Sequence, residues 1–165
     1  MNFANVKALA IPEGNVKQIA DGQGVVLWKK AAPPLKISSI TKPAVGTSSI
    51  TGDRTATMAR TAMGNDGTFT VYYSNFDTSK YSRIKISYSI VFGQVMSAAY
   101  AVSKVTFSSS TEVTQTVYNG ETKTGTLYIN RSSSSGSFTV KITNGRKLNN
   151  RSCDVTVSIT IAAAI

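Results

Sequence analysis

Residues 81–91 read YSRIKISYSIV, and this stretch decides the expected fold class of the chain. Apolar residues recur there at every second position, at Ile84, Ile86, Tyr88 and Ile90. Lysine and serine occupy the positions between them. Because successive side chains of a strand point to opposite faces of its sheet, this alternation predicts a strand with one buried face and one exposed face.

The same period of two recurs along most of the chain that follows the first 35 residues. It predicts single rows of inward-facing residues in four more segments: Phe69, Val71 and Tyr73; Leu127 and Ile129; Phe138, Val140 and Ile142; and Val155, Val157, Ile159 and Ile161. We expect further strands over residues 36–41, 54–60, 98–107 and 111–118. Residues 55–63 and 94–102 contain alanine and methionine, so a short helix is the alternative there.

Roughly eight or nine short strands without a helical period between them predict an all-β fold, an antiparallel β-sandwich of immunoglobulin-like or jelly-roll type. Asn119-Gly120 predicts a tight turn, because glycine after asparagine readily supplies a positive φ. The serine-rich tract over residues 132–137 lies between two of the expected strands. We expect it to form a mobile hairpin loop.

The first 30 residues differ from the rest, because short apolar runs alternate there with glycine-containing turns. The runs cover residues 6–11, 16–19 and 25–28. This pattern predicts a three-stranded β-hairpin or meander module over residues 1–30. Pro33 and Pro34 favour an extended spacer, so we expect a linker over residues 31–35 and the sandwich over residues 36–165.

The residue inventory argues against catalysis. The chain of 165 residues contains no histidine and a single cysteine, Cys153, which excludes histidine-dependent triads, internal disulfides and multi-cysteine metal sites. Most of the eight acidic residues fall in or beside expected turns, where they are common. We therefore expect no catalytic residues, no metal and no cofactor. A β-sandwich glycosidase stays open as a third class, because the separation of two carboxylates cannot be read from a sequence.

The net charge of +10 favours anionic partners, such as nucleic acid, lipopolysaccharide, teichoic acid or an acidic protein surface. The densest basic stretch, residues 141–151, lacks interleaved aromatic residues, so we expect no specific nucleic-acid binding. No run approaches the roughly 20 apolar residues that span a bilayer, so we expect no membrane insertion. Tyr72 and Tyr128 are candidate glycan-binding residues, because both are expected to face outward and tyrosine joins an apolar ring to a polar tip.

Residues 6–30, VKALAIPEGNVKQIADGQGVVLWKK, resemble a short N-terminal module of virion proteins from tailed bacteriophages. In that group an apolar strand, a Val-Lys-x-Ile strand and a Val-Leu-Trp-Lys strand precede a variable β domain. The resemblance implies a non-enzymatic structural protein of the virion: a tail-associated, fibre or head-decoration component. Its N-terminal module would dock to the particle, and its sandwich would serve assembly or host-surface binding, with an anionic host glycan as one partner.

The resemblance also implies other virion proteins as partners and a homo-oligomer, a trimer for a fibre-like part. It implies location in the virion after synthesis in the bacterial host cytoplasm. The expected docking or oligomer interface consists of the apolar residues of the module: Val6, Leu9, Ile11, Val16, Ile19, Val25, Leu27 and Trp28. These residues could instead fill a private core against the sandwich. The alternative function is a free carbohydrate-binding β-sandwich module, which leaves the opening module unexplained.

Overall fold

The computed structural model describes residues 18–20, 26–29, 33–44, 46–60, 66–93, 102–109, 111–144 and 154–165. These residues contain twelve strands and no helix. The chain divides into two compact units, Met1–Pro33 and Pro34–Ile165. The division falls between the two prolines of the expected linker.

The first unit contains a two-stranded antiparallel sheet made of β1 (Gln18–Ala20) and β2 (Val26–Lys29). Its register places Ile19 opposite Trp28. The first strand of the expected meander, over residues 6–11, lies outside the described residues. So do five of the docking candidates: Val6, Leu9, Ile11, Val16 and Val25.

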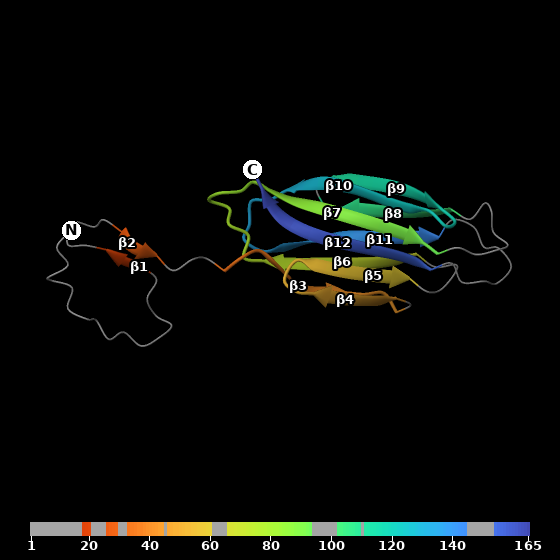
Figure 1. Cartoon of the computed structure of the whole chain (residues 1–165), viewed down its shortest axis with the longest axis horizontal. Coiled ribbons are helices and arrows are strands. Elements are labelled where there is room, and N and C mark those ends of the chain that lie inside the picture. The colour runs from red at the N-terminus through yellow and green to blue at the C-terminus, as the bar shows by residue number, and fades with distance from the viewer. Residues whose placement is uncertain are drawn as a thin grey trace. The chain divides into compact units, whose positions relative to one another are not determined.

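The second unit is a sandwich of two five-stranded sheets, and all of their strand pairs are antiparallel (Figure 1). The Tyr128 sheet is named here for its exposed tyrosine. In spatial order it consists of β10 (Thr122–Asn130), β7 (Arg83–Phe92), β12 (Val155–Ala164), β5 (Thr55–Arg60) and β4 (Thr47–Thr51). The all-β antiparallel sandwich expected from the sequence is confirmed.

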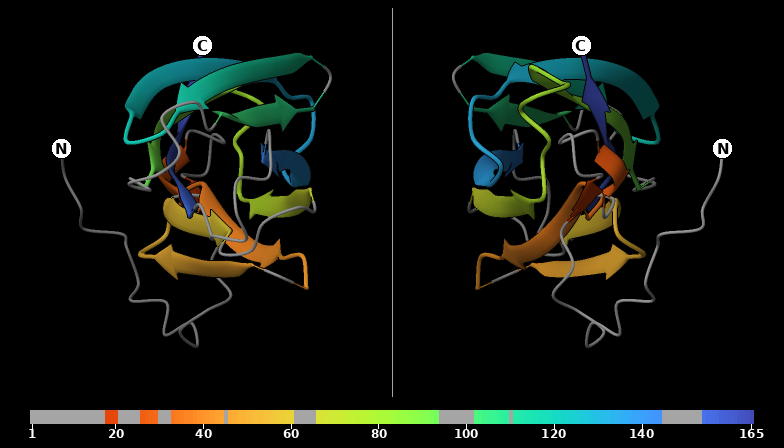
Figure 2. Two further views of the ribbon diagram at one scale, coloured as in Figure 1. Left: turned by 90° about the vertical axis from the view of Figure 1, so that its right-hand side faces the viewer. Right: turned by 90° about the vertical axis from the view of Figure 1, so that its left-hand side faces the viewer.

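The opposite sheet is named the Tyr72 sheet in the same way. In spatial order it consists of β3 (Lys36–Thr41), β6 (Gly67–Ser74), β11 (Gly136–Asn144), β8 (Val102–Ser108) and β9 (Glu112–Tyr118). Strands β9 and β10 lie side by side along one edge of the sandwich, and β3 and β4 along the other. Figure 2 shows the two layers from their ends.

The connections between strands mostly cross from one sheet to the other. Among the described strands of the sandwich, β4–β5 and β8–β9 are hairpins within one sheet, and every other consecutive pair changes sheet. The serine-rich tract therefore links β10 of one sheet to β11 of the other, and the expected hairpin at this point is wrong. Asn119 and Gly120 do form the expected turn: Gly120 has φ 76° and the Glu121 amide donates to the Tyr118 carbonyl over 2.9 Å.

The core lies between the sheets and is formed by the alternating rows. Ile84, Ile86 and Ile90 of β7 have no exposed surface, and the rows predicted on β6, β10, β11 and β12 are all buried. The ring of Tyr88 packs across the core against Phe107 of β8, with 4.9 Å between ring centroids. Residues 55–60 form strand β5 and not a helix, whereas residues 94–101 lie outside the described part of the chain.

Candidate functional site

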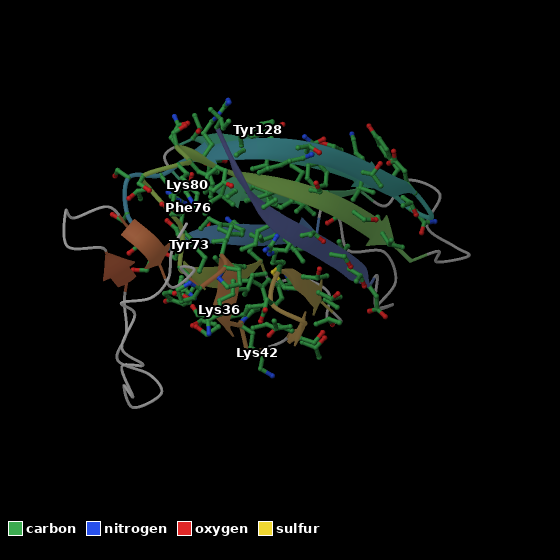
Figure 3. The ribbon with its side chains drawn as sticks, turned by 60° about the vertical axis from the view of Figure 1, so that its left-hand side comes forward. Lys36, Lys42, Tyr73, Phe76, Lys80 and Tyr128 are labelled. Atoms are coloured by element: carbon green, nitrogen blue, oxygen red, sulfur yellow. The ribbon has the colours of Figure 1, made fainter. Side chains whose placement is uncertain are left out.

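The two candidate tyrosines face outward but lie on opposite sheets. Tyr128 on β10 is 49% exposed and Tyr72 on β6 is 40% exposed. Their exposure follows the alternation of their strands. Because the core separates the two sheets, one flat ligand cannot stack on both rings. Figure 3 shows Tyr128 on the outside of the sandwich, with the buried Tyr73 and Phe76 closer to its middle.

Two cations of β7 surround Tyr128. Lys85 is its direct cross-strand partner. The guanidinium carbon of Arg83 lies 5.1 Å from the centroid of the Tyr128 ring. Arg83 in turn donates from Nε to the backbone oxygen of Ile165 over 2.7 Å, and its Nη2 donates to the same oxygen. The stacked arginine is therefore held in place before any ligand arrives.

Beyond Tyr128, hydroxyl side chains form two rows across the outer face of the Tyr128 sheet. The register aligns them across all five strands, from β4 to β10: Thr51, Thr55, Thr160, Ser87 and Thr126 in one row, and Ser49, Thr57, Ser158, Ser89 and Thr124 in the next. Neighbouring hydroxyls share hydrogen bonds, at 3.1 Å between Thr55 and Thr160 and at 3.3 Å between Thr57 and Ser158. The rows lie about 6.7 Å apart along the strands.

None of the five strands of the Tyr128 sheet contains an aspartate or a glutamate. Within these strands the outward-facing charged side chains are therefore the cations Arg83 and Lys85, and Asp154 lies just before β12. The two cations favour ligands of the opposite sign and disfavour ligands of their own. This face is suited to an anionic ligand that also offers hydrogen-bonding groups and an apolar surface for the ring.

The outer face of the Tyr72 sheet is chemically different. Tyr72 lies between two serines, Ser39 of β3 and Ser137 of β11. Glu112 lies on β9, and the carboxylate of Asp66, just before β6, is 2.8 Å from the Lys141 ammonium. The hydrogen bond from Lys141 holds the pKa of Asp66 below its usual range. On this face Lys141 is thus paired with a carboxylate.

Sequence reasoning found Tyr128 but not Arg83 or the serine and threonine rows as parts of one site. Alternation alone places Lys85 and Arg83 on the exposed side of their strand. It does not show that β10 pairs with β7, and that pairing is what brings the cations to the tyrosine. Of the remaining docking candidates, Ile19, Leu27 and Trp28 lie on β1 and β2 of the N-terminal unit.

In the described part of the chain, no cluster of three or more histidine, cysteine, aspartate or glutamate residues is arranged to hold a metal ion. The described part of the chain also contains no helix that is long and apolar enough to cross a membrane. Cys153 lies outside them.

No protein-family model and no curated protein matches this sequence. Among solved structures, TmCBM61 in complex with β-1,4-galactotriose is similar, with a TM-score of 0.43 and 9% identity over 78% of this chain and 90% of that chain. The enzymatically active domain of tailspike protein 4 from bacteriophage CBA120 matches with a TM-score of 0.39 and 7% identity, over 81% of this chain and 20% of that chain.

The family 11 carbohydrate-binding module from Clostridium thermocellum, in complex with a β-1,3-1,4-mixed-linked tetrasaccharide, is a third similar structure. It matches with a TM-score of 0.32 and 14% identity, over 82% of this chain and 99% of that chain. At these identities and TM-scores the likenesses do not extend to function, and the chemistry of the face has to be argued from its own residues.

Proposed function

We propose that the sandwich binds an acidic glycan across the outer face of the Tyr128 sheet. The observation that carries this proposal is an exposed tyrosine beside two cations, on five strands that contain no carboxylate. The sugar would stack on the free part of the Tyr128 ring, and its acidic group would lie near Arg83 or Lys85. The chain would act by binding and would catalyse no reaction.

Each part of the face supports one feature of such a ligand. An aromatic ring offers apolar surface to the C–H groups of a sugar, and the phenol hydroxyl offers a polar tip. The hydroxyl rows are donors and acceptors of the kind that sugar hydroxyls need. Because Arg83 is already fixed by Ile165, little side-chain entropy is lost when a ligand binds. The strands beneath the face also lack the pair of carboxylates on which glycoside hydrolysis generally depends.

The test is calorimetric titration of the full chain and its variants with a panel of acidic and neutral bacterial polysaccharides. The wild-type chain should bind acidic members more tightly than neutral ones. Tyr128→Ala should weaken binding about tenfold or more, which corresponds to about 1.4 kcal/mol, because the ring is the centre of the contact. Tyr72→Ala is the matched control, since it removes a tyrosine of similar exposure from the opposite sheet, and its affinity should stay within about twofold of wild type.

Both variants should keep the thermal unfolding profile of the wild type, because both side chains are largely outside the core. If Tyr72→Ala lost binding and Tyr128→Ala kept it, the ligand would lie on the Tyr72 sheet. Equal affinity for acidic and neutral polysaccharides would remove the role given to Arg83 and Lys85.

A second candidate function concerns the whole chain: a structural protein of a phage virion, with the N-terminal unit as its docking module. It is favoured by the separate compact unit around β1 and β2, which contains the segment that resembles a virion module. A unit of about 30 residues buries too little apolar surface to be stable alone in water, so we expect it to pack on a partner surface. Under this proposal the partners are other virion proteins, copies of the same chain and a glycan of the host surface.

The docking proposal is tested by cosedimentation with phage particles that lack this protein. Full-length chain should pellet with the particles, and a chain that begins at Leu35 should stay in the supernatant. Pelleting of both forms would assign attachment to the sandwich. Pelleting of neither would leave the sandwich as a free glycan-binding module.

A further inference from the structure

A pocket lies at the end of the sandwich, beside the connection between β10 and β11. Its volume is about 250 Å³, and its walls are Tyr73 and the residues from Asn130 to Ser137, with the exception of Ser134. Two backbone hydrogen bonds tie the connection to the segment between β6 and β7: the Arg131 amide donates to Ser82 over 2.8 Å, and the Phe76 amide donates to Ser134 over 2.9 Å. Tyr73 and Phe76 lie together at this end in Figure 3.

Arg131 is the charged group of this pocket. Its guanidinium carbon lies 5.4 Å from the centroid of the Tyr73 ring, and its Nη2 donates to the Ser137 carbonyl over 2.9 Å. Its Nε is buried and has no hydrogen-bond partner. A buried N–H of a cation without an acceptor is costly, so the guanidinium is not fully satisfied by its protein partners. Burial raises the pKa of Tyr73, which keeps the phenol neutral beside the arginine.

The rest of the lining offers hydrogen bonds without negative charge. Four serines contribute hydroxyls and Asn130 contributes an amide, and the lining contains no carboxylate. Hydroxyls and a guanidinium together are the donors that bind oxyanions, and an arginine can meet a carboxylate or a phosphate with two parallel N–H groups. The pocket is smaller than the roughly 300 Å³ at which sites for whole organic ligands begin. Its size therefore suits one substituent group and not an oligosaccharide.

We propose that this pocket binds an oxyanion group, namely a carboxylate, sulfate or phosphate carried by a sugar. Arg131 supplies the charge, and the serine hydroxyls and the Asn130 amide supply hydrogen-bond donors. The pocket adjoins the glycan-binding face, because Asn130 lines it and lies two residues beyond Tyr128 on the same side of β10. The claim that the oxyanion is carried by a sugar rests on the proposed function of that face. The claim that the pocket binds a free oxyanion does not depend on it.

The experiment follows the Nε–H resonance of Arg131 in ¹⁵N-labelled full chain by NMR, with the resonance assigned from its loss in Arg131→Lys. Sodium sulfate, sodium phosphate and sodium glucuronate are titrated separately, and sodium chloride keeps the ionic strength constant. At least one oxyanion should shift the Arg131 resonance along a saturating curve, while the resonance of Arg54 stays in place. Preference for glucuronate indicates a carboxylate with its sugar ring, and preference for sulfate or phosphate indicates a tetrahedral group.

Ser133→Glu tests the pocket without removing Arg131, whose contacts with Tyr73 and Ser137 also support the loop. The new carboxylate would repel an incoming oxyanion and compete with it for Arg131, and it should weaken oxyanion binding about tenfold or more. Ser133→Gln, of the same size without the charge, should bind as wild type does. Ser134→Glu adds the same charge at the residue that does not line the pocket, and it should have at most a twofold effect.

Absence of a saturating shift at Arg131 with all three oxyanions overturns the proposal, as does undiminished binding in Ser133→Glu. Neither result affects the glycan-binding face, whose test is the loss of polysaccharide affinity in Tyr128→Ala. Conversely, Tyr128→Ala should keep the full response of Arg131 to free oxyanions. The two proposals can therefore fail separately.

Discussion

The outer faces of the two sheets have similar side chains and differ in the position of their carboxylates. Both are rich in serine and threonine, and both expose tyrosine, Tyr128 on one face and Tyr72 and Tyr118 on the other. The Tyr72 sheet contains Glu112 on β9 and the pair of Lys141 with Asp66, which lies just before β6, whereas the strands of the Tyr128 sheet contain no carboxylate. The net charge of the chain says little about this difference, because Glu112 is the one acidic residue within the described strands and it lies on β9.

The sheets also share a structural device, a tyrosine that lies over a cross-strand glycine. Tyr88 of β7 lies opposite Gly125 of β10, and Tyr73 of β6 lies opposite Gly136 of β11. In both pairs a Cβ on the glycine would collide with the tyrosine hydroxyl, at 2.6 Å in the case of Gly136. Glycine in each pair leaves room for the ring, which in turn covers the backbone that glycine would expose.

The largest expected effect comes from a methyl group at Gly125. Gly125→Ala should destabilise the chain by about 2–3 kcal/mol, because its Cβ would collide with the ring of Tyr88, which is buried and packed against Phe107. Gly136→Ala should cost only about 1 kcal/mol, since Tyr73 borders the pocket and its hydroxyl end can move into it. Urea unfolding of both variants at neutral pH measures the difference. Equal losses would mean that the pocket gives Tyr73 no freedom.

The next largest effect is expected on polysaccharide affinity when the charge of one lysine on each face is reversed. Lys85→Glu should weaken binding of an acidic polysaccharide about tenfold at low salt, because it places a negative charge, which repels the acidic ligand, beside Tyr128. Lys104→Glu changes the net charge equally, on the outer side of the Tyr72 sheet, and should change the affinity less than twofold. Calorimetric titration at low and physiological ionic strength measures both. If the two variants lose the same affinity, the attraction comes from net charge and not from one face.

The sequence predicted the fold class and the buried rows, because the period of two is a local property of each strand. Phe69, Phe138 and Val157 were expected inside and are buried. Which strands pair is decided by distant segments that fit together. Leu127 lies opposite Ile86 and Phe138 lies opposite Val71, so β10 and β11 pair with β7 and β6 and not with each other. The hairpin expected between them failed for this reason.

For the site, the sequence predicted that Tyr72 and Tyr128 are exposed, but not which neighbours they have. Arg83 reaches Tyr128 through the pairing of β7 with β10, and its orientation comes from Ile165 at the end of the described chain. Arg131 contacts Tyr73 because the β10–β11 connection passes from one sheet to the other. Such contacts join residues that are far apart in the sequence, and no local sequence pattern predicts them.

A smaller effect is expected from one hydroxyl of the rows. Thr160→Val keeps the branched side chain that suits a strand and removes the hydroxyl that bonds to Thr55. Binding of the acidic polysaccharide should weaken about two- to threefold, since a single hydrogen bond contributes little net free energy. Thr106→Val on the Tyr72 sheet removes the matching bond to Thr114, 2.9 Å long, and should leave the affinity unchanged. Unchanged affinity in Thr160→Val would restrict the ligand to the tyrosine end of the face.

The smallest effect concerns the carboxylate of the Tyr72 sheet. The pKa of Asp66 is lowered chiefly by the hydrogen bond from Lys141, so the pair stabilises the fold above the ordinary carboxyl pKa, near 4, and this contribution is lost as the pH falls through the lower pKa of the folded state. Both side chains are about half exposed, so Asp66→Asn should cost less than about 1 kcal/mol at pH 7. Urea unfolding at pH 7 and pH 2.5 should show the gap between wild type and variant shrinking in acid. A gap that persists at pH 2.5 would come from packing and not from charge. Polysaccharide affinity at pH 7 should be the same in both proteins, because Asp66 lies on the sheet opposite the proposed glycan-binding face.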